Sequence, residues 1–174
     1  IAATARSEAG RPIFVARQPI FDRVSRTAGY EILFRRTAEN RYDATDHDAA
    51  TAINIEQSLT AFGFDFLVGD RQAYVNLTQE SLVREYYRML PRERTVLELL
   101  ESIRPEPGVI EACRKARAQG YTLALDDYAG HDSSESMLAL VDVVKVDLRQ
   151  YPAGFDADIV ARLRAGGRRL VAEK

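Results

Sequence analysis

The chain has 174 residues, of which 46% are hydrophobic and 29% charged, a balance typical of one globular domain that excludes a disordered chain. The formal net charge of −2 comes from interspersed acidic and basic residues, so we expect no nucleic-acid partner. Cys113 is the only cysteine, which excludes a disulfide framework and a thiolate metal cluster and favours a cytoplasmic location. No run approaches the ~20 apolar residues of a membrane span, so we expect no membrane association.

The first third of the chain is predicted to contain a hairpin followed by a helix. Residues 1–11 lack a hydrophobic pattern and are predicted to be an unstructured start. Residues 12–21 and 28–34 are strand-like runs separated by a polar turn, which indicates two antiparallel strands. Residues 35–48 have the composition of a polar loop, and residues 49–62 carry apolar side chains at helical spacing.

The rest of the chain alternates between strand-like and helix-like patterns. Such alternation predicts parallel βαβ units. The apolar runs 96–100 and 123–125 suit a sheet that is covered by helices, since they are apolar on both faces. The expected strands are 74–77, 96–100, 121–128, 143–146 and 169–172, and the expected helices are 78–90, 109–116, 134–141 and 158–163.

Two α/β architectures fit this alternation, an open doubly wound sheet and a (β/α) barrel. Polar groups at several strand ends favour the barrel, whose active sites lie on the face formed by the C-terminal strand ends. A full barrel typically has ~250 residues. We therefore predict that residues 12–174 form one barrel domain that is incomplete at its C-terminal end and short by roughly one βα unit.

Polar side chains stand at or near the ends of successive predicted strands. Because the carboxyl ends of parallel strands meet at one edge, we expect these side chains to converge. Carboxylate and amide oxygens are the ligands that Mg²⁺ and Mn²⁺ take in proteins, and two adjacent carboxylates suit a two-metal phosphoesterase site. The candidates are Glu31, Asn76, Glu98, Asp126 and Asp127 as oxygen ligands, Lys145 to offset phosphate charge or hold a water, and Glu173 as a further ligand or orienting group.

Each of these residues also has a purely structural interpretation. The adjacent aspartates could cap a turn or a helix. Glu98 and Lys145 could form a simple ion pair, and Asn76 could cap a turn. Glu31 could point to solvent from an edge strand. The recurrence of such groups at corresponding strand ends favours the functional interpretation.

Seven short motifs occur in order along the chain, and most of them contain one of these polar residues. They are Gln18-Pro-Ile20, Glu31-Ile-Leu-Phe-Arg35, Val75-Asn-Leu77, Leu97-Glu-Leu-Leu-Glu-Ser102, Leu125-Asp-Asp-Tyr128, Val144-Lys-Val-Asp147 and Val171-Ala-Glu-Lys174. This series resembles the EAL domain family, the cyclic di-GMP phosphodiesterase domains of bacteria. The sequence around the first two motifs is most similar to the branch in which the EAL domain precedes an HDOD domain.

The resemblance implies a fold, a cofactor and a role for each site residue. The fold is a TIM-like barrel whose first strand is antiparallel, the cofactor is Mg²⁺ or Mn²⁺, and the reaction is hydrolysis of one phosphodiester of cyclic di-GMP to linear pGpG. By resemblance, the first metal is bound by Glu31, Asn76, Glu98 and Asp126, and the second by Asp127. By the same resemblance, Lys145 orients the water, Glu173 completes the site and Glu101 braces the loop after Asp127. The resemblance also implies that Arg35 meets a phosphate and that Gln18 faces a guanine.

The chain departs from active members of the family at several positions. Residues 129–134 read Ala-Gly-His-Asp-Ser-Ser where active members carry a Gly-Thr-Gly-Tyr-Ser-Ser loop that links metal occupancy to dimerisation. Ile32 replaces an alanine, and Lys174 replaces a glycine. We therefore interpret the chain as a degenerate regulatory domain with weak or no turnover, which binds cyclic di-GMP or signals through an HDOD domain, another protein or a homodimer.

Two alternatives stay open. In the first alternative, the chain is an active Mg- or Mn-dependent phosphodiesterase, because every ligand type is present. In the second, it is a different β/α enzyme that acts on another phosphorylated small molecule.

Overall fold

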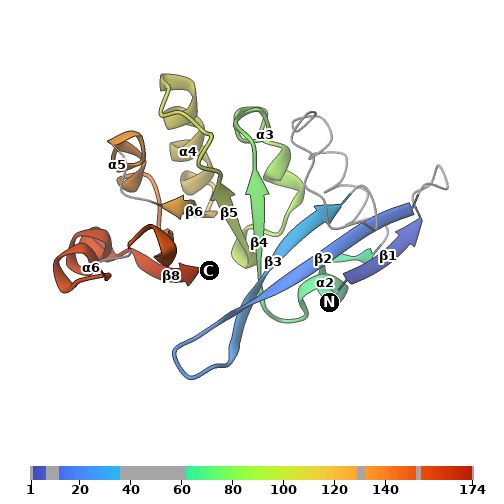
Figure 1. The fold of residues 1–174 in the computed structure, drawn as a ribbon. Helices are drawn as coiled ribbons and strands as arrows, with labels where there is room; N and C mark the ends of the chain where they lie inside the picture. Colours follow the sequence, from blue (N-terminus) through green and yellow to red (C-terminus); the bar gives the residue numbers. More distant parts are fainter. Residues whose placement is uncertain (1, 7–11, 36–61, 129–131, 152–153, 174) are drawn as a thin grey trace.

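The computed structural model describes residues 2–6, 12–35, 62–128, 132–151 and 154–173. In these residues eight strands form one sheet, and their order in space follows their order in the chain (Figure 1). The first three strands pair antiparallel, and all later pairs are parallel. The strands are β1 (Ala2–Arg6), β2 (Pro12–Phe21), β3 (Thr27–Arg35), β4 (Gln72–Leu77), β5 (Thr95–Leu99), β6 (Thr122–Tyr128), β7 (Val143–Asp147) and β8 (Arg169–Glu173).

Helices connect the parallel strands, and Figure 1 shows α3 to α6 in a row along one side of the curved sheet. A doubly wound sheet reverses its strand order where the helices change faces, and the described strands show no reversal. The barrel-type winding expected from the strand-end groups is therefore confirmed. None of the described helices is long and apolar enough to cross a bilayer. The helices are α2 (Phe64–Val68), α3 (Gln79–Val83), α4 (Pro107–Ala118), α5 (Asp132–Leu138) and α6 (Ala157–Arg164).

The two edges of the sheet in the described part of the chain are β1 and β8. Strand β8 pairs with β7 and strand β1 pairs with β2, so the sheet curls without closing on itself. This is the incomplete TIM-like barrel that the sequence predicts, with an antiparallel hairpin ahead of the parallel strands.

The predicted hairpin is confirmed as β2 and β3, with Gln18 opposite Glu31. Its turn is formed by Asp22, whose Oδ1 accepts hydrogen bonds from the backbone N–H groups of Val24 and Arg26, each at 2.9 Å. This is the local hydrogen bonding for which aspartate is favoured in turns.

Strand β1 corrects the expectation that residues 1–11 are unstructured. Ala2–Arg6 pairs antiparallel with β2, Ala2 opposite Ala16 and Arg6 opposite Pro12, whereas residues 7–11 lie outside the described residues. An edge strand offers unpaired backbone N–H and C=O groups to any extended segment, whatever its side chains. A weak hydrophobic pattern therefore does not prevent pairing at this edge.

The helix expected at residues 78–90 is wrong as a single helix. Thr78 caps α3 as the sequence suggests, accepting a hydrogen bond from the backbone N–H of Ser81 at 3.2 Å. The helix ends at Val83, Glu85 adopts a left-handed conformation at φ 57°, and a 3₁₀ helix follows at Tyr86–Met89. The helix predicted at residues 49–62 lies outside the described residues except for its last position.

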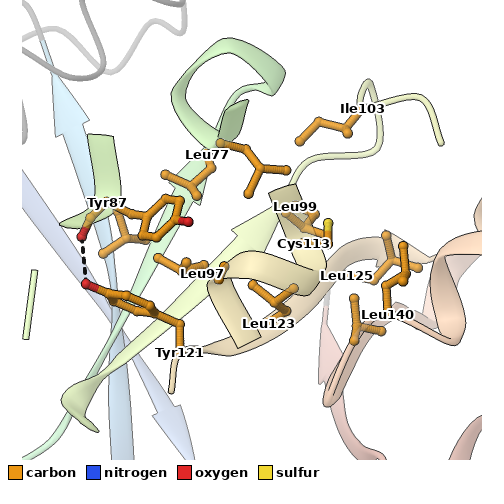
Figure 2. Close-up of a cluster of buried hydrophobic side chains, with 14 of the residues drawn as sticks. Leu77, Tyr87, Leu97, Leu99, Ile103, Cys113, Tyr121, Leu123, Leu125 and Leu140 are labelled. Atoms are coloured by element: carbon orange, nitrogen blue, oxygen red, sulfur yellow. Dashed lines mark hydrogen bonds between the residues drawn. The ribbon is translucent and has the colours of Figure 1, made fainter. Parts of the chain in front are cut away.

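Packing against a second tyrosine accounts for this break. The Tyr87 ring is fully buried and meets the Tyr121 ring edge to face at 4.9 Å between centroids. The Tyr121 hydroxyl lies within hydrogen-bonding distance of the Leu90 carbonyl at 2.9 Å and of the Tyr87 carbonyl at 3.2 Å, and Figure 2 draws its bond to Tyr87. Tertiary contacts therefore override the helical spacing of this segment.

The main hydrophobic core lies between the sheet and the helices (Figure 2). It includes Cys113 of α4, which is fully buried as the sequence predicts for a core cysteine. A smaller cluster lies on the opposite, inner face of the sheet. Strands β4 to β7 each contribute alternate side chains to two apolar layers, because strand side chains point to opposite faces in turn.

Candidate metal and ligand site

The predicted site residues form a polar layer directly above the small inner cluster. That cluster consists of Tyr74, Val96, Ala124 and Val143. The residue two positions further along each strand points to the same side of the sheet. Those residues are Asn76, Glu98, Asp126 and Lys145, and Glu173 stands in the same relation to Val171, which packs against the cluster.

Strand β3 adds Glu31 to this layer, and Gly29 lies two positions before it. A methyl group on Gly29 would lie 2.9 Å from the Tyr74 ring and 2.9 Å from the backbone oxygen of Gln72. The absence of a side chain at Gly29 therefore makes room for the Tyr74 ring, which forms part of the floor of the site.

Lys145 lies at the centre of the polar layer. Its Nζ is 2.7 Å from both Glu98 Oε1 and Asp126 Oδ1. It is 2.9 Å from Glu173 Oε1 and 3.3 Å from Glu31 Oε2. Only 1% of the Lys145 side chain is exposed. One buried ammonium therefore faces four carboxylates, which leaves an excess of negative charge.

Several ligand atoms in this layer have no hydrogen-bond partner among the described residues. Asn76 donates through Nδ2 to Glu31 Oε1 at 3.1 Å, but its Oδ1 is buried and unpaired. Glu98 Oε2 is likewise buried without a partner, and Lys145, at 2.7 Å, is the group that reaches Glu98 Oε1. Such buried oxygens are unfavourable unless a donor or a cation reaches them. The oxygen-only donor set therefore fits a hard divalent cation such as Mg²⁺ or Mn²⁺.

An irregularity in β6 places Asp127 in the site. The pairing of β6 with β7 shifts register between Leu125 and Tyr128, and Asp127 has a left-handed φ of 44°. In a regular strand, adjacent side chains would point to opposite faces. Here Asp126 and Asp127 both line the same pocket, and their carboxylate oxygens lie within 4.8 Å of each other and of a Glu101 oxygen.

Burial controls the protonation of this site. Burial raises the pKa of Glu98 well above its usual range, and the attraction of Lys145 offsets only part of this effect. Burial likewise raises the pKa of Asp126 and of Glu173. For Lys145, burial favours the neutral amine, but the carboxylates led by Glu98 outweigh it and raise the pKa above its ordinary value. The ammonium therefore persists, while the carboxylic acids hold their protons to higher pH.

An open cleft of about 630 Å³ lies beside the polar layer, in the gap between the β2–β3 hairpin and β8 where the described sheet does not close. Its polar wall includes Gln18, which is exposed and stands opposite Glu31 in the hairpin. Its apolar wall includes Leu170, which sequence reasoning did not select, because isolated apolar residues carry no functional signal. Arg35 ends β3, and its side chain lies outside the described residues.

The geometry distinguishes the site from the purely structural interpretations of its residues. The ion pair between Glu98 and Lys145 exists, but it is one part of a larger carboxylate cluster. Asn76 bonds to Glu31 and not to a turn, and Thr78 caps α3 instead. The Glu31 side chain is only 14% exposed, so the solvent-facing alternative is wrong.

A second polar group, absent from the sequence predictions, supports the residue after Asp127. Tyr128 is almost fully buried, and its hydroxyl donates to the Glu135 carboxylate on α5. Arg162 of α6 donates to the same carboxylate at 2.5 Å and to the Tyr128 hydroxyl at 3.3 Å. Arg162 lies 27 residues after Glu135 and 34 after Tyr128, so no local pattern could reveal that it completes this group.

No protein-family model matches the chain. A curated relative, the cyclic di-GMP phosphodiesterase CdgJ of Vibrio cholerae, is 34% identical over 158 residues, which cover 90% of this chain and 37% of CdgJ. The chain spans about a third of the length of the curated relatives it matches.

Solved structures agree in fold. The BlrP1 manganese and cyclic di-GMP complex of Klebsiella pneumoniae matches with a TM-score of 0.72 at 21% identity, covering 99% of this chain and 52% of that one. The Bacillus subtilis YkuI protein, which has an EAL domain and was solved with cyclic di-GMP and calcium, matches with a TM-score of 0.65 at 19% identity, covering 98% and 48%. Fold and sequence relationship together assign this chain to the EAL domain family.

Proposed function

We propose that this chain is a cyclic di-GMP signalling domain of EAL type whose inner pocket binds a divalent cation and the cyclic dinucleotide, with weak or no turnover. The observation that carries the proposal is the convergence of four carboxylates on Lys145 beside an open cleft of about 630 Å³. The relatives add support, because CdgJ is named a cyclic di-GMP phosphodiesterase and BlrP1 and YkuI were solved with this ligand.

The cation would be held by the carboxylate and amide oxygens of the polar layer. Glu31, Asn76, Glu98 and Asp126 would hold the first Mg²⁺ or Mn²⁺, and Asp127 would hold a second, with Glu101 bracing the loop beside it. When bound, such a cation supplies Lewis-acid stabilisation of negative charge on a phosphoryl group. The unpaired Asn76 and Glu98 oxygens support this assignment, because they offer lone pairs in a buried position.

The remaining site residues would bind the ligand and a water. Lys145 lies at the base of the pocket and would orient a water beside the phosphate through an N–H donor that is freed when Glu98 or Asp126 binds the cation. Glu173 would accept a hydrogen bond from that water. Gln18, exposed in the pocket wall, would contact a guanine edge. Arg35, at the end of β3, would meet a phosphate, since its guanidinium suits phosphate oxygens.

Weak turnover follows from the sequence after the aspartate pair. Residues 129–134 lack the loop sequence of active members, and that loop follows directly on Asp127 and Tyr128. A second candidate, an active phosphodiesterase that forms pGpG, is favoured by a different observation, the presence and convergence of every ligand type.

Paired titrations of the full-length protein separate these functions. Calorimetry with cyclic di-GMP in Mn²⁺ measures binding, and chromatography of pGpG measures hydrolysis. Binding without hydrolysis supports the regulatory domain, and Mn²⁺-dependent pGpG formation that Glu31→Ala abolishes supports the phosphodiesterase. If the protein shows no binding and no hydrolysis of cyclic di-GMP, both functions are excluded. An enzyme that acts on another phosphorylated molecule then remains.

The partners and location belong to the same proposal. We propose a cytoplasmic protein that signals through an HDOD domain, another signalling protein or a homodimer. The similarity of the first two motifs to the HDOD-associated branch supports the first of these. Co-purification and light scattering of the full-length protein with and without cyclic di-GMP would test each arrangement.

A further inference from the structure

The Lys145 ammonium makes an unusual set of contacts for a lysine. Its three shortest contacts, to Glu98, Asp126 and Glu173, match the three N–H donors that an ammonium possesses. Glu31 lies further away at 3.3 Å and has Asn76 as its other partner. In the described part of the chain, all ion pairs of these four carboxylates go to Lys145.

This arrangement needs a cation in order to persist. Four carboxylates drawn to one point in a largely buried layer repel each other, and burial strengthens the repulsion because solvent screening is weak there. Lys145 cannot move its charge away, since its side chain is 1% exposed and stands above the apolar floor of Tyr74, Val96 and Val143.

We propose that Lys145 is an internal counter-cation, which keeps the four carboxylates assembled when no metal is bound and competes with a divalent cation for Glu98 and Asp126. The competition rests on the metal site proposed above, whereas the counter-cation role in the metal-free protein does not. A divalent cation that takes oxygens of Glu98 and Asp126 weakens their attraction to the ammonium. Lys145 therefore preserves the geometry of the site and lowers its metal affinity at the same time.

The chain offers a matched control at another lysine. Lys115 of α4 pairs with Glu85, but 52% of its side chain is exposed, so this pair is screened by water. Lys145→Met and Lys115→Met make the same chemical change, one in a buried carboxylate cluster and one at the surface.

The experiment compares melting temperatures of the full-length protein in EDTA and in Mn²⁺. In EDTA, Lys145→Met should lower the melting temperature by roughly 10 °C, because a buried charge cluster loses its counter-ion, whereas Lys115→Met should change it by at most about 2 °C. Adding Mn²⁺ should raise the melting temperature of Lys145→Met more than that of the wild type. Calorimetry with Mn²⁺ should then show a tighter dissociation constant for Lys145→Met.

A second variant keeps the test decisive if Lys145→Met fails to fold without metal. The double variant Lys145→Met/Glu98→Gln removes one repelling carboxylate, so it should fold and regain part of the lost melting temperature. A purely steric role for the lysine would give no such recovery, because glutamine has the same shape as glutamate.

Four outcomes decide the inference. An EDTA melting temperature of Lys145→Met equal to that of Lys115→Met would overturn the counter-cation role, and so would no recovery in the double variant. A smaller Mn²⁺-induced shift than in the wild type would overturn the competition. If Mn²⁺ shifts no variant, the proposed metal-dependent function and the competition both fail, while the EDTA comparison still decides the counter-cation role.

Discussion

The two faces of the same strands carry opposite chemistry. In β5, Leu97 and Leu99 point to the helices and join the main core, whereas Val96 and Glu98 point inward, and all four are fully buried. On the outer face, Leu97 and Leu99 follow Thr95, which is also buried. Within two residues, the inner face changes from Val96, in the apolar floor, to the carboxylate of Glu98, in the polar layer. One strand can thus stabilise the fold with one face and hold a charged site with the other.

The contrast between the two faces separates the residues that stabilise the fold from those that form the site. Apolar burial on the outer face contributes to the free energy of unfolding through removal of surface from water. The carboxylates of the inner face are buried against their preference, as the raised pKa of Glu98 records. Substitutions of apolar residues on the outer face should therefore change stability, and substitutions of the ligand carboxylates in the polar layer should change binding.

The largest effect is expected on the outer face. Leu97→Ala should reduce the free energy of unfolding by about 2–5 kcal/mol, because it leaves a cavity in a fully buried position. Urea denaturation measures this loss. Leu148→Ala, at a side chain 40% exposed, is the control and should stay within about 0.5 kcal/mol of the wild type. Equal effects at the two positions would contradict the distinction between the faces.

Next in size is a substitution in the polar layer. Asp126→Asn should weaken Mn²⁺ binding by at least roughly 10-fold, since it removes a charged ligand, while leaving the free energy of unfolding unchanged or higher. Calorimetry and urea denaturation give the two numbers. Asp65→Asn, at an exposed position paired with Arg94, should leave Mn²⁺ affinity unchanged. Undiminished Mn²⁺ affinity in Asp126→Asn would remove Asp126 from the metal site.

The floor beneath the polar layer should respond to added volume. Gly29→Ala should cost about 1–3 kcal/mol of unfolding free energy, because the methyl group would overlap the Tyr74 ring. Gly108→Ala in α4 adds the same methyl group where no atom lies within 4 Å, and it should be neutral or stabilising. Thermal unfolding of both variants provides the comparison, and a neutral Gly29→Ala would show that Tyr74 has room to shift.

Metal-free stability should fall as the pH rises. Glu98, Asp126 and Glu173 have pKa values raised by burial, so the folded protein binds more protons than the unfolded chain once the pH exceeds their unfolded values. Their contribution to stability is present at acidic pH and is lost as the pH rises through the folded values. In EDTA, the melting temperature should drop by roughly 2–4 °C between pH 5 and pH 8.

Mn²⁺ should reverse this dependence, because it stabilises the ionised carboxylates. The Mn²⁺-induced increase in melting temperature should therefore be greater at pH 8 than at pH 5. A metal-free melting temperature that rises with pH would contradict the assigned directions of the pKa shifts.

The smallest effect concerns the thiol of the outer core. Burial raises the pKa of Cys113 to about 11, and the side chain is fully buried. A thiol reagent at pH 8 should therefore label the native protein only as fast as it unfolds, since the reactive thiolate is both scarce and inaccessible. Labelling in mild urea should accelerate in parallel with unfolding. Rapid labelling without denaturant would show that α4 opens locally.

The sequence alone determined the hairpin, the alternation of strands and helices, and the residue types of the site. These follow from local regularities: a period of two along strands, helical spacing of apolar residues, and polar groups at strand ends. The prediction of a single helix at residues 78–90 failed because Tyr87 packs against Tyr121, more than thirty residues later in the chain. The β1 strand escaped prediction because backbone pairing carries no side-chain signature.

Two features of the site became visible only in the tertiary structure: Lys145 lies among four carboxylates, and Asp127 lines the same pocket as Asp126. The contact from Lys145 to Glu31 spans 114 residues and depends on the register of every strand pair between β3 and β7. The left-handed Asp127 depends on a shift in one of those pairs. A local pattern specifies which groups reach the edge of a sheet, but the distances between those groups are set by strand register and sheet curvature, which no single segment encodes.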